Sequence, residues 1–261
     1  MKRINENCSI VLYNSLIIRI ITCFILLKSL FLFDIITIFA HKSKKMKLYQ
    51  AVFLIILILI IDQFSKVFIK TNFFYGEAYH VFGLDWFQLY FIENEGMAWG
   101  TKIPGDYGKV ILTVFRILVM PFIGYWLWDS IEREKSNFLI VSIALIFAGA
   151  FGNIIDSVLY GVLFDESNPL TRNLAILGSD NPYGTFFHGK VVDMFYFPIW
   201  HGNLPEWIPF LGGNEFTFFN AIFNVADFAI SVGIGILIFF NKRAFTLPPN
   251  SISRVFHNKL D

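Results

Sequence analysis

The chain has 261 residues, of which 56% are hydrophobic, 18% are aromatic and only 16% are charged. An ordinary soluble domain is less apolar, so the composition excludes that class and indicates a polytopic membrane protein. The net charge of +1 gives no sign of a nucleic-acid partner. The only cysteines are Cys8 and Cys23, which excludes disulfides and thiolate metal sites from the rest of the chain.

The first 45 residues form an N-terminal region whose role the sequence leaves open. Its apolar stretch over 16–40 is interrupted by Arg19, Lys28 and Asp34. A methionine and a lysine at 46–47 then stand directly before the first uninterrupted apolar segment, as at a natural start. We interpret residues 1–45 as an extension that comes from a mis-called start; an extra interfacial or spanning helix is the alternative. No small-residue cleavage site follows the apolar stretch, which argues against a cleaved signal peptide.

Four apolar segments are long enough to cross about 30 Å of hydrocarbon, which takes about 20 helical residues. Lysine and arginine residues lie before the first segment, between the second and third, and after the fourth. The positive-inside rule therefore places both ends of the four-span core, 46–243, and the tail, 244–261, in the cytoplasm. Two extracytoplasmic loops follow at about 70–109 and 160–217. The predicted transmembrane helices cover 48–68, 110–128, 138–159 and 218–240.

The two outer loops have too many aromatic residues to be floppy polar linkers. The stretch 79–91 is aromatic and partly alternating, which predicts β-structure. We therefore expect a mainly α membrane protein with four transmembrane helices and a small extracytoplasmic β-containing cradle and loop. Several aromatic residues of the second loop are typical of membrane-interface anchors. These residues are Trp200, Trp207, Phe210 and Phe216.

Two short motifs, 191–195 and 223–227, each place one aspartate among apolar and aromatic residues. An ionised carboxylate at membrane depth costs roughly 2.5–3.5 kcal/mol on insertion scales, so such residues usually have a function. Both Asp193 and Asp227 are expected at the outer membrane boundary, one from the loop and one from the fourth helix. They predict a paired-carboxylate site that shares one proton and activates a water. Asp227 alone is also explained as a helix cap.

Other polar residues lie near the outer ends of the predicted helices. Asp62 and Lys66 share a helix face four residues apart, which fits either a boundary ion pair or a substrate head-group contact. Asn94 and Gly96 lie in the stretch NEGMAWG, where small residues permit close backbone approach to a ligand; a simple turn would look the same.

Two further pairs are spaced three residues apart, so each pair shares a helix face. Asn153 and Asp156 follow Gly152 in GNIID, and the alternative for them is polar contact between helices. Asn224 precedes Asp227 by the same spacing. His188 is expected to be structural. The sequence has no HEXXH motif and no evident spacing of metal ligands.

The motifs DQFSK, NEGMAWG, GNIID, VVDMFYF and FNVAD, in this order on four spans, resemble those of the lipoprotein signal peptidases (signal peptidase II). The resemblance covers 46–240. It implies an aspartic endopeptidase that removes the signal peptide from diacylglyceryl-modified prolipoproteins before the lipidated cysteine. The family's catalytic aspartates match Asp193 and Asp227. Its other motif residues match Asp62, Lys66, Asn94, Gly96, Gly152, Asn153, Asp156, Asn224 and Ala226.

The resemblance further implies a monomer in the bacterial inner membrane, with the active site near the outer face, no cofactor and no metal. Its partners would be the prolipoproteins and membrane lipid. One departure is Ser157, where the family commonly has an arginine; Arg172 or Lys190 could supply that charge. The rival functions are a transporter that relays protons through Asp62, Asp156 and Asp227, and an inactive scaffold that binds lipoproteins.

Overall fold

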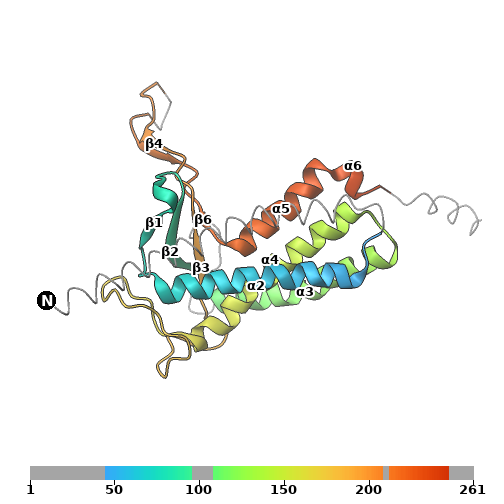
Figure 1. Ribbon diagram of the computed structural model, residues 1–261, viewed down its shortest axis with the longest axis horizontal. Coiled ribbons are helices and arrows are strands. Elements are labelled where there is room, and N and C mark those ends of the chain that lie inside the picture. The colour runs from blue at the N-terminus through green and yellow to red at the C-terminus, as the bar shows by residue number, and fades with distance from the viewer. Residues whose placement is uncertain (1–44, 96–107, 208–211, 247–261) are drawn as a thin grey trace, which may run out of the picture.

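The computed structural model describes residues 45–95, 108–207 and 212–246. Four main helices lie along the longest dimension, with a small sheet and two long loops at one end (Figure 1). The helices are α2 (Leu48–Asn72), α3 (Gly108–Glu132), α4 (Asn137–Leu163) and α5 (Val225–Phe239), followed by the short α6 (Asn241–Ala244). In the described part of the chain, three helices, α2, α3 and α4, are long and apolar enough to cross a membrane.

The first three predicted spans are confirmed as helices, each extending a few residues beyond its predicted bounds. The predicted start of the fourth at 218 is wrong. Phe218 ends strand β5 (Glu215–Phe218), and β6 (Ile222–Phe223) comes before the helix begins at Val225. The 15 residues of α5 rise only about 22 Å, at 1.5 Å per residue. A fourth full membrane crossing, and the division of the chain at 45 and 244, stay predictions.

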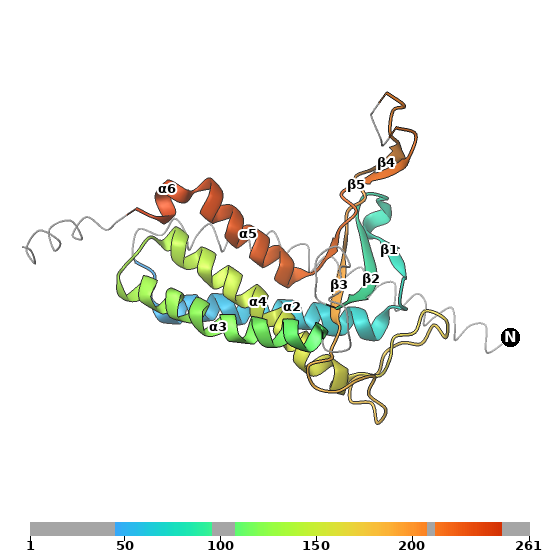
Figure 2. The same ribbon diagram turned by 180° about the vertical axis from the view of Figure 1, so that it is seen from behind.

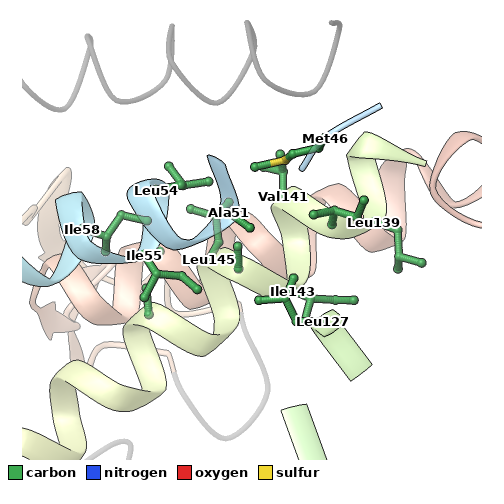
Figure 3. Close-up of a cluster of buried hydrophobic side chains, with 14 of the residues drawn as sticks. Met46, Ala51, Leu54, Ile55, Ile58, Leu127, Leu139, Val141, Ile143 and Leu145 are labelled. Atoms are coloured by element: carbon green, nitrogen blue, oxygen red, sulfur yellow. The ribbon is translucent and has the colours of Figure 1, made fainter. Parts of the chain in front are cut away.

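The helix α4 lies at the centre of the bundle and packs against α2, α3 and α5. Their buried apolar side chains form one continuous bundle core, which includes Leu54, Leu127 and Ile143 (Figure 3). α4 and α5 approach especially closely at Gly149. A β-carbon at that position would lie 2.3 Å from the Ala226 carbonyl oxygen, so only glycine permits this approach.

Large apolar side chains also cover the outer surfaces of α2 and α3. Phe53 and Ile60 of α2 are exposed, as are Phe115 and Phe122 of α3. A helix that is apolar on its outer as well as its inner face is typical of a membrane span, where lipid covers the outer face. The expected membrane protein is therefore confirmed at the level of its helices.

The basic residues gather at the end of the bundle opposite the sheet. The Lys45 ammonium donates a hydrogen bond to the Glu134 carbonyl oxygen at 2.7 Å, which joins the start of α2 to the turn between α3 and α4. Lys242 and Arg243 lie in α6, which packs on α4 and α5. All three basic segments of the sequence thus meet at one end of the molecule.

At the other end is a four-stranded antiparallel sheet in the order β1-β2-β3-β6 (Figure 2). β1 (Ala78–His80) and β2 (Gln88–Asn94) confirm the β-structure predicted over 79–91. β3 (Val191–Tyr196) pairs with β2, so that Ile92 lies opposite Asp193. A separate hairpin joins β4 (Trp200–Asn203) to β5. The sheet packs on the ends of α2 and α4 through a second core that includes Phe91, Tyr160 and Met194.

The loop after α4 returns and binds to the end of that helix. The backbone N–H groups of Gly184, Phe187 and Gly189 donate to carbonyl oxygens of Gly161, Val158 and Ser157 at 2.9–3.2 Å. The Gly161 carbonyl is in the last turn of α4, where carbonyls otherwise lack backbone partners. The contact is so close that a β-carbon on Gly189 would lie 1.9 Å from the Asp156 carbonyl oxygen. The chain therefore enters β3, and reaches Asp193, from a fixed point on α4.

Candidate active site

The side chain of Asp193 is buried on β3 and held by two amides. Its Oδ1 accepts a hydrogen bond from Asn224 Nδ2 at 2.7 Å, and its Oδ2 accepts one from Asn94 Nδ2. Asn94 ends β2 and Asn224 precedes α5. The pairing of β2 with β3 thus brings one asparagine to this carboxyl, and the start of α5 brings the other.

Asp227 lies in the first turn of α5 and is half-buried. Its backbone N–H donates to Asn224 Oδ1 at 2.9 Å, and its Oδ2 accepts from the Asn224 N–H at 3.3 Å. This reciprocal pair is a capping box, so the capping role considered for Asp227 is real. Its Oδ1 accepts from Asn153 Nδ2 at 2.8 Å. Asn224 therefore contacts both aspartates and joins them into one group.

A buried lysine stands behind this group. The Lys66 ammonium lies 2.9 Å from Asn153 Oδ1, 2.9 Å from Asp62 Oδ2 and 2.7 Å from Asp156 Oδ2. Lys66, Asp62 and Asp156 are all completely buried. Because a buried charge is costly without partners, this triad is a firm anchor between α2 and α4. Asn153 connects it to Asp227.

The start of α5 is also fixed directly by α2. Asp62 Oδ1 accepts a hydrogen bond from the backbone N–H of Ala226 at 2.8 Å. Gly152 makes room for this carboxylate, because a β-carbon there would lie 2.6 Å from Asp62 Oδ2. The structure thus brings the DQFSK, GNIID, VVDMFYF and FNVAD motifs together, with Asn94 of the NEGMAWG motif. Gly96 lies outside the described residues.

Gln63 belongs to the DQFSK motif, but sequence reasoning assigned it no role of its own. Its Nε2 donates to Asp62 Oδ2 at 3.0 Å and to Asp156 Oδ1 at 2.8 Å. Its Oε1 accepts from the Tyr160 hydroxyl at 3.3 Å. Its place in DQFSK was the available signal; adjacent helical residues point in different directions, so spacing alone did not predict that Gln63 contacts Asp62.

A second buried polar cluster was also missed. The Lys70 ammonium pairs with Glu93 of β2 and donates to Ser167 Oγ at 2.9 Å. It lies 5.2 Å and 5.1 Å from the ring centres of Phe164 and Tyr183. The available signals were that Lys70 follows Lys66 by four residues and that Glu93 directly precedes Asn94. This cluster joins α2, β2 and the loop after α4.

The environment of Asp193 favours its neutral form. Burial, with the nearby charge of Asp227, raises the pKa of Asp193 to about 8 from an ordinary value of 3.8. Hydrogen bonds from Asn224 and Asn94 and the charge of Lys66 oppose this shift without cancelling it. These surroundings therefore favour the protonated form of Asp193 at neutral pH.

The two cations considered as replacements for an arginine at Ser157 have other partners. Arg172 stacks over the Phe74 ring at 5.2 Å, and the Lys190 ammonium lies 3.8 Å from Glu93 Oε2. Ser157 itself is buried and donates to the Asn153 carbonyl oxygen at 2.9 Å. A different arginine, Arg116 of α3, lies close enough to Asp227 for the two charges to attract each other.

The side-chain hydrogen bonds of His188 to other described residues are local, in keeping with a structural role. Its Nδ1 lies 2.9 Å from Thr185 Oγ1 and 3.0 Å from the Phe186 carbonyl oxygen. Among the residues that the structure describes, no group of three or more His, Cys, Asp or Glu side chains could hold a metal ion.

The helices are apolar and of membrane length, and at one end of the bundle lie two aspartates linked through Asn224. This combination is typical of a membrane hydrolase that uses acid–base chemistry, in which two carboxyls activate water. The sequence profile described as signal peptidase (SPase) II matches residues 54–242. The chain therefore belongs to the signal peptidase II family, which comprises aspartic-type membrane peptidases.

Individual relatives agree with this assignment. The lipoprotein signal peptidase of Porphyromonas gingivalis is 42% identical over 195 residues, which cover 74% of this chain and 83% of that protein. The lipoprotein signal peptidase of Amoebophilus asiaticus is 34% identical over 199 residues, covering 74% and 78%. A solved bacterial membrane enzyme has a similar fold, with a TM-score of 0.50, 23% identity and coverage of 77% of this chain and 93% of that one.

Proposed function

We propose that this membrane peptidase removes the signal peptide from diacylglyceryl-modified prolipoproteins, cutting before the lipidated cysteine, with Asp193 and Asp227 as its catalytic pair. The observation that carries the proposal is the double contact of Asn224, which binds Asp193 through its side chain and Asp227 through its backbone. One polar residue thus holds two carboxyls in a common group, as a shared proton requires. Family membership supports the reaction.

In the proposed mechanism the two aspartates have different roles. Asp193 is buried and its raised pKa favours the protonated form, so it donates a hydrogen bond to the scissile carbonyl oxygen. Asp227 is half-buried and lies where the helix dipole favours a negative charge. It takes a proton from a water molecule, which attacks the carbonyl carbon. The proton on the pair then passes to the leaving amine, and no acyl-enzyme forms.

The neighbouring polar residues position this pair. Asn94 and Asn224 orient the Asp193 carboxyl, and Asn153 orients Asp227. The Lys66 ammonium fixes Asn153 through its Oδ1, so that the Asn153 amide N–H faces Asp227. Lys66 is in turn paired with Asp62 and Asp156, and Gln63 donates a hydrogen bond to Asp156. Such support keeps the reacting groups within the small tolerance that catalysis needs.

The position of the site fits a substrate anchored in lipid. The aspartates lie at the sheet end of the bundle, and the basic segments that flank the helices, at Lys45, at the α3–α4 turn and in α6, lie at the opposite end. The positive-inside rule then places the site near the outer face of the bacterial inner membrane. There a signal peptide can lie among the lipids while its lipidated cysteine stays at the surface. We propose that the chain acts as a monomer.

The test is cleavage of a diacylglyceryl-modified prolipoprotein by the purified full chain in detergent, with and without a chelator. We expect Asp193→Asn and Asp227→Asn each to reduce kcat at least about 1,000-fold, because groups that act as a unit fail together. The matched control is Asp180→Asn, which changes an exposed acid in the loop after α4. Full activity in either dyad variant, with the chain folded, would contradict the assignment.

A further inference from the structure

The hairpin of β4 and β5 has two chemically different faces. Its register pairs Trp200 with Phe218 and Gly202 with Phe216. Directly paired residues of an antiparallel ribbon, and residues two apart along a strand, point to the same side. One face is therefore aromatic. The opposite face carries His201, Asn203, Glu215 and Thr217.

The aromatic face forms one exposed surface. The Trp200 ring lies along its strand over Gly202, where a β-carbon would be 2.8 Å from Cζ2, and its centre is 6.3 Å from that of Phe216. Trp200, Phe216 and Phe218 are 47%, 42% and 54% exposed. Among the described helices and strands, β4 and β5 make extensive contacts only with each other. Something outside the described protein must cover these rings to remove them from water.

The direction of the hairpin suggests what covers it. Both views show it projecting from the sheet across the helix axes, on the side of α5 (Figures 1 and 2). The long helices cross the bilayer, so a segment that runs across their axes at one end follows the membrane surface. Phe219, directly after β5, and Phe228 of α5 are exposed as well, so the chain that links the hairpin to the bundle also carries large apolar side chains at its surface.

We propose that the aromatic face of the β4–β5 hairpin docks on the outer surface of the lipid bilayer, with its polar face toward water. Tryptophan is the residue type most suited to the headgroup region, because its ring is apolar and its N–H finds polar partners there. Docking would hold the end of β3, and with it Asp193, at the depth of the lipid headgroups. This last consequence rests on the proposed function.

The test is independent of activity. Spin labels are placed singly at Phe216→Cys and Glu215→Cys in the full chain with Cys8→Ser and Cys23→Ser, in nanodiscs of phosphatidylethanolamine and phosphatidylglycerol. These neighbours lie on opposite faces of one strand, so each is the control for the other. Power saturation should show the label at 216 more accessible to oxygen than to a water-soluble nickel chelate. The label at 215 should show the reverse.

Two results would overturn the proposal. Equal access of the nickel chelate to both labels would mean that the aromatic face is in water. Protection of the 216 label that is accompanied by dipolar coupling between labels in vesicles would mean that a second copy of the chain covers it.

A second measurement leaves position 216 unchanged. Phe218→Asp should raise KM for a vesicle-bound prolipoprotein roughly threefold to fivefold, since a charge near the interface is modestly unfavourable. The same variant should cleave as the wild type does in detergent, and Thr217→Asp on the polar face should behave as the wild type in both. An unchanged KM of Phe218→Asp in vesicles would contradict docking. Failure of the wild type to cleave the prolipoprotein in detergent would contradict only the proposed function.

Discussion

At the scale of single residues, Asn224 explains how two aspartates from distant parts of the chain become one group. Asp193 comes from a strand and Asp227 from a helix, and Asn224 bonds to both. It also lies 3.3 Å from Asn153 Oδ1, which is bonded to Lys66. The aspartates are thus connected to the buried Lys66 triad by side-chain amides, which are polar yet uncharged and add no further charge to a buried site.

The pKa of Asp193 predicts a pH-dependent stability. Its value of about 8 in the folded state exceeds the ordinary 3.8, so folding binds a proton between these pH values. The unfolded state binds fewer protons there, and the free energy of unfolding should fall by up to about 1.4 kcal/mol per pH unit as the pH rises from 4 to 8. Thermal unfolding in detergent across this range should show a steeper decline for the wild type than for Asp193→Asn. Parallel declines would refute the shift.

Sequence reasoning found the residues whose surroundings were unusual. Asp193 and Asp227 were conspicuous because carboxylates rarely stand among apolar residues, and Asn153, Asp156 and Asn224 were found by their three-residue spacings. Lys70 and Glu93 were missed because each looks like a surface charge in a linear pattern. Only the fold shows that they are buried together.

At the scale of helices and strands, the close packing of α4 on α5 positions Asp227. Gly149→Ala would place a methyl group 2.3 Å from the Ala226 carbonyl oxygen, which must push the start of α5 away. We expect a loss of stability of about 1–3 kcal/mol, and roughly 100-fold lower kcat if Asp227 moves by about 1 Å.

The matched control for this change is Gly235→Ala in α5, where nothing lies within 4 Å of the added carbon. It should keep its activity and gain about 1 kcal/mol from helix propensity. Cleavage rates and melting temperatures of the two variants decide the matter. Equal activities would show that the contact at Gly149 does not position Asp227.

The Lys70–Glu93 pair should couple α2 to β2. Lys70→Met or Glu93→Gln alone leaves a buried group without its partner and should destabilise the protein by about 3–5 kcal/mol. The double variant should lose less stability than the two single losses added together, because neither Lys70 nor Glu93 is then left as a buried charge without the other. A double-mutant cycle of melting temperatures measures this coupling. Strictly additive losses would mean that the two side chains act separately.

The predicted elements were most accurate where the apolar runs were longest. α2, α3 and α4 follow directly from their length and hydropathy. The error at 218 arose because Phe218, Phe219 and Phe223 continue the apolar pattern into α5, with only Asn220 and Asn224 interrupting it. Their partners in the strands, Trp200 for Phe218 and Phe195 for Phe223, are distant in sequence, so a local pattern could not reveal the pairing.

At the scale of the whole molecule, the basic segments at Lys45, at the α3–α4 turn and in α6 lie at the end opposite the aspartates, and this predicts the orientation in the membrane. Single cysteines at Glu132 and Leu170 would report on the two ends in a chain with Cys8→Ser and Cys23→Ser; both positions are exposed. In intact spheroplasts an impermeant maleimide should label position 170, and it should reach 132 only after the membrane is opened. The opposite labelling pattern would invert the proposed topology.

The return of the loop onto α4 has a consequence for how this chain can vary. Residues 183–189 are bound to the last turns of the helix, so the two ends of the excursion that begins at Phe164 meet at a fixed place. The entropy of closing such a loop grows only with the logarithm of its length. The short tip at 179–182 lies between two residues bonded to the end of α4, since Gly178 N–H donates to the Leu163 carbonyl and Tyr183 N–H to that of Phe164. This tip can therefore lengthen or accept an inserted domain without moving Asp193, which makes it a natural site for evolutionary elaboration of the extracytoplasmic surface.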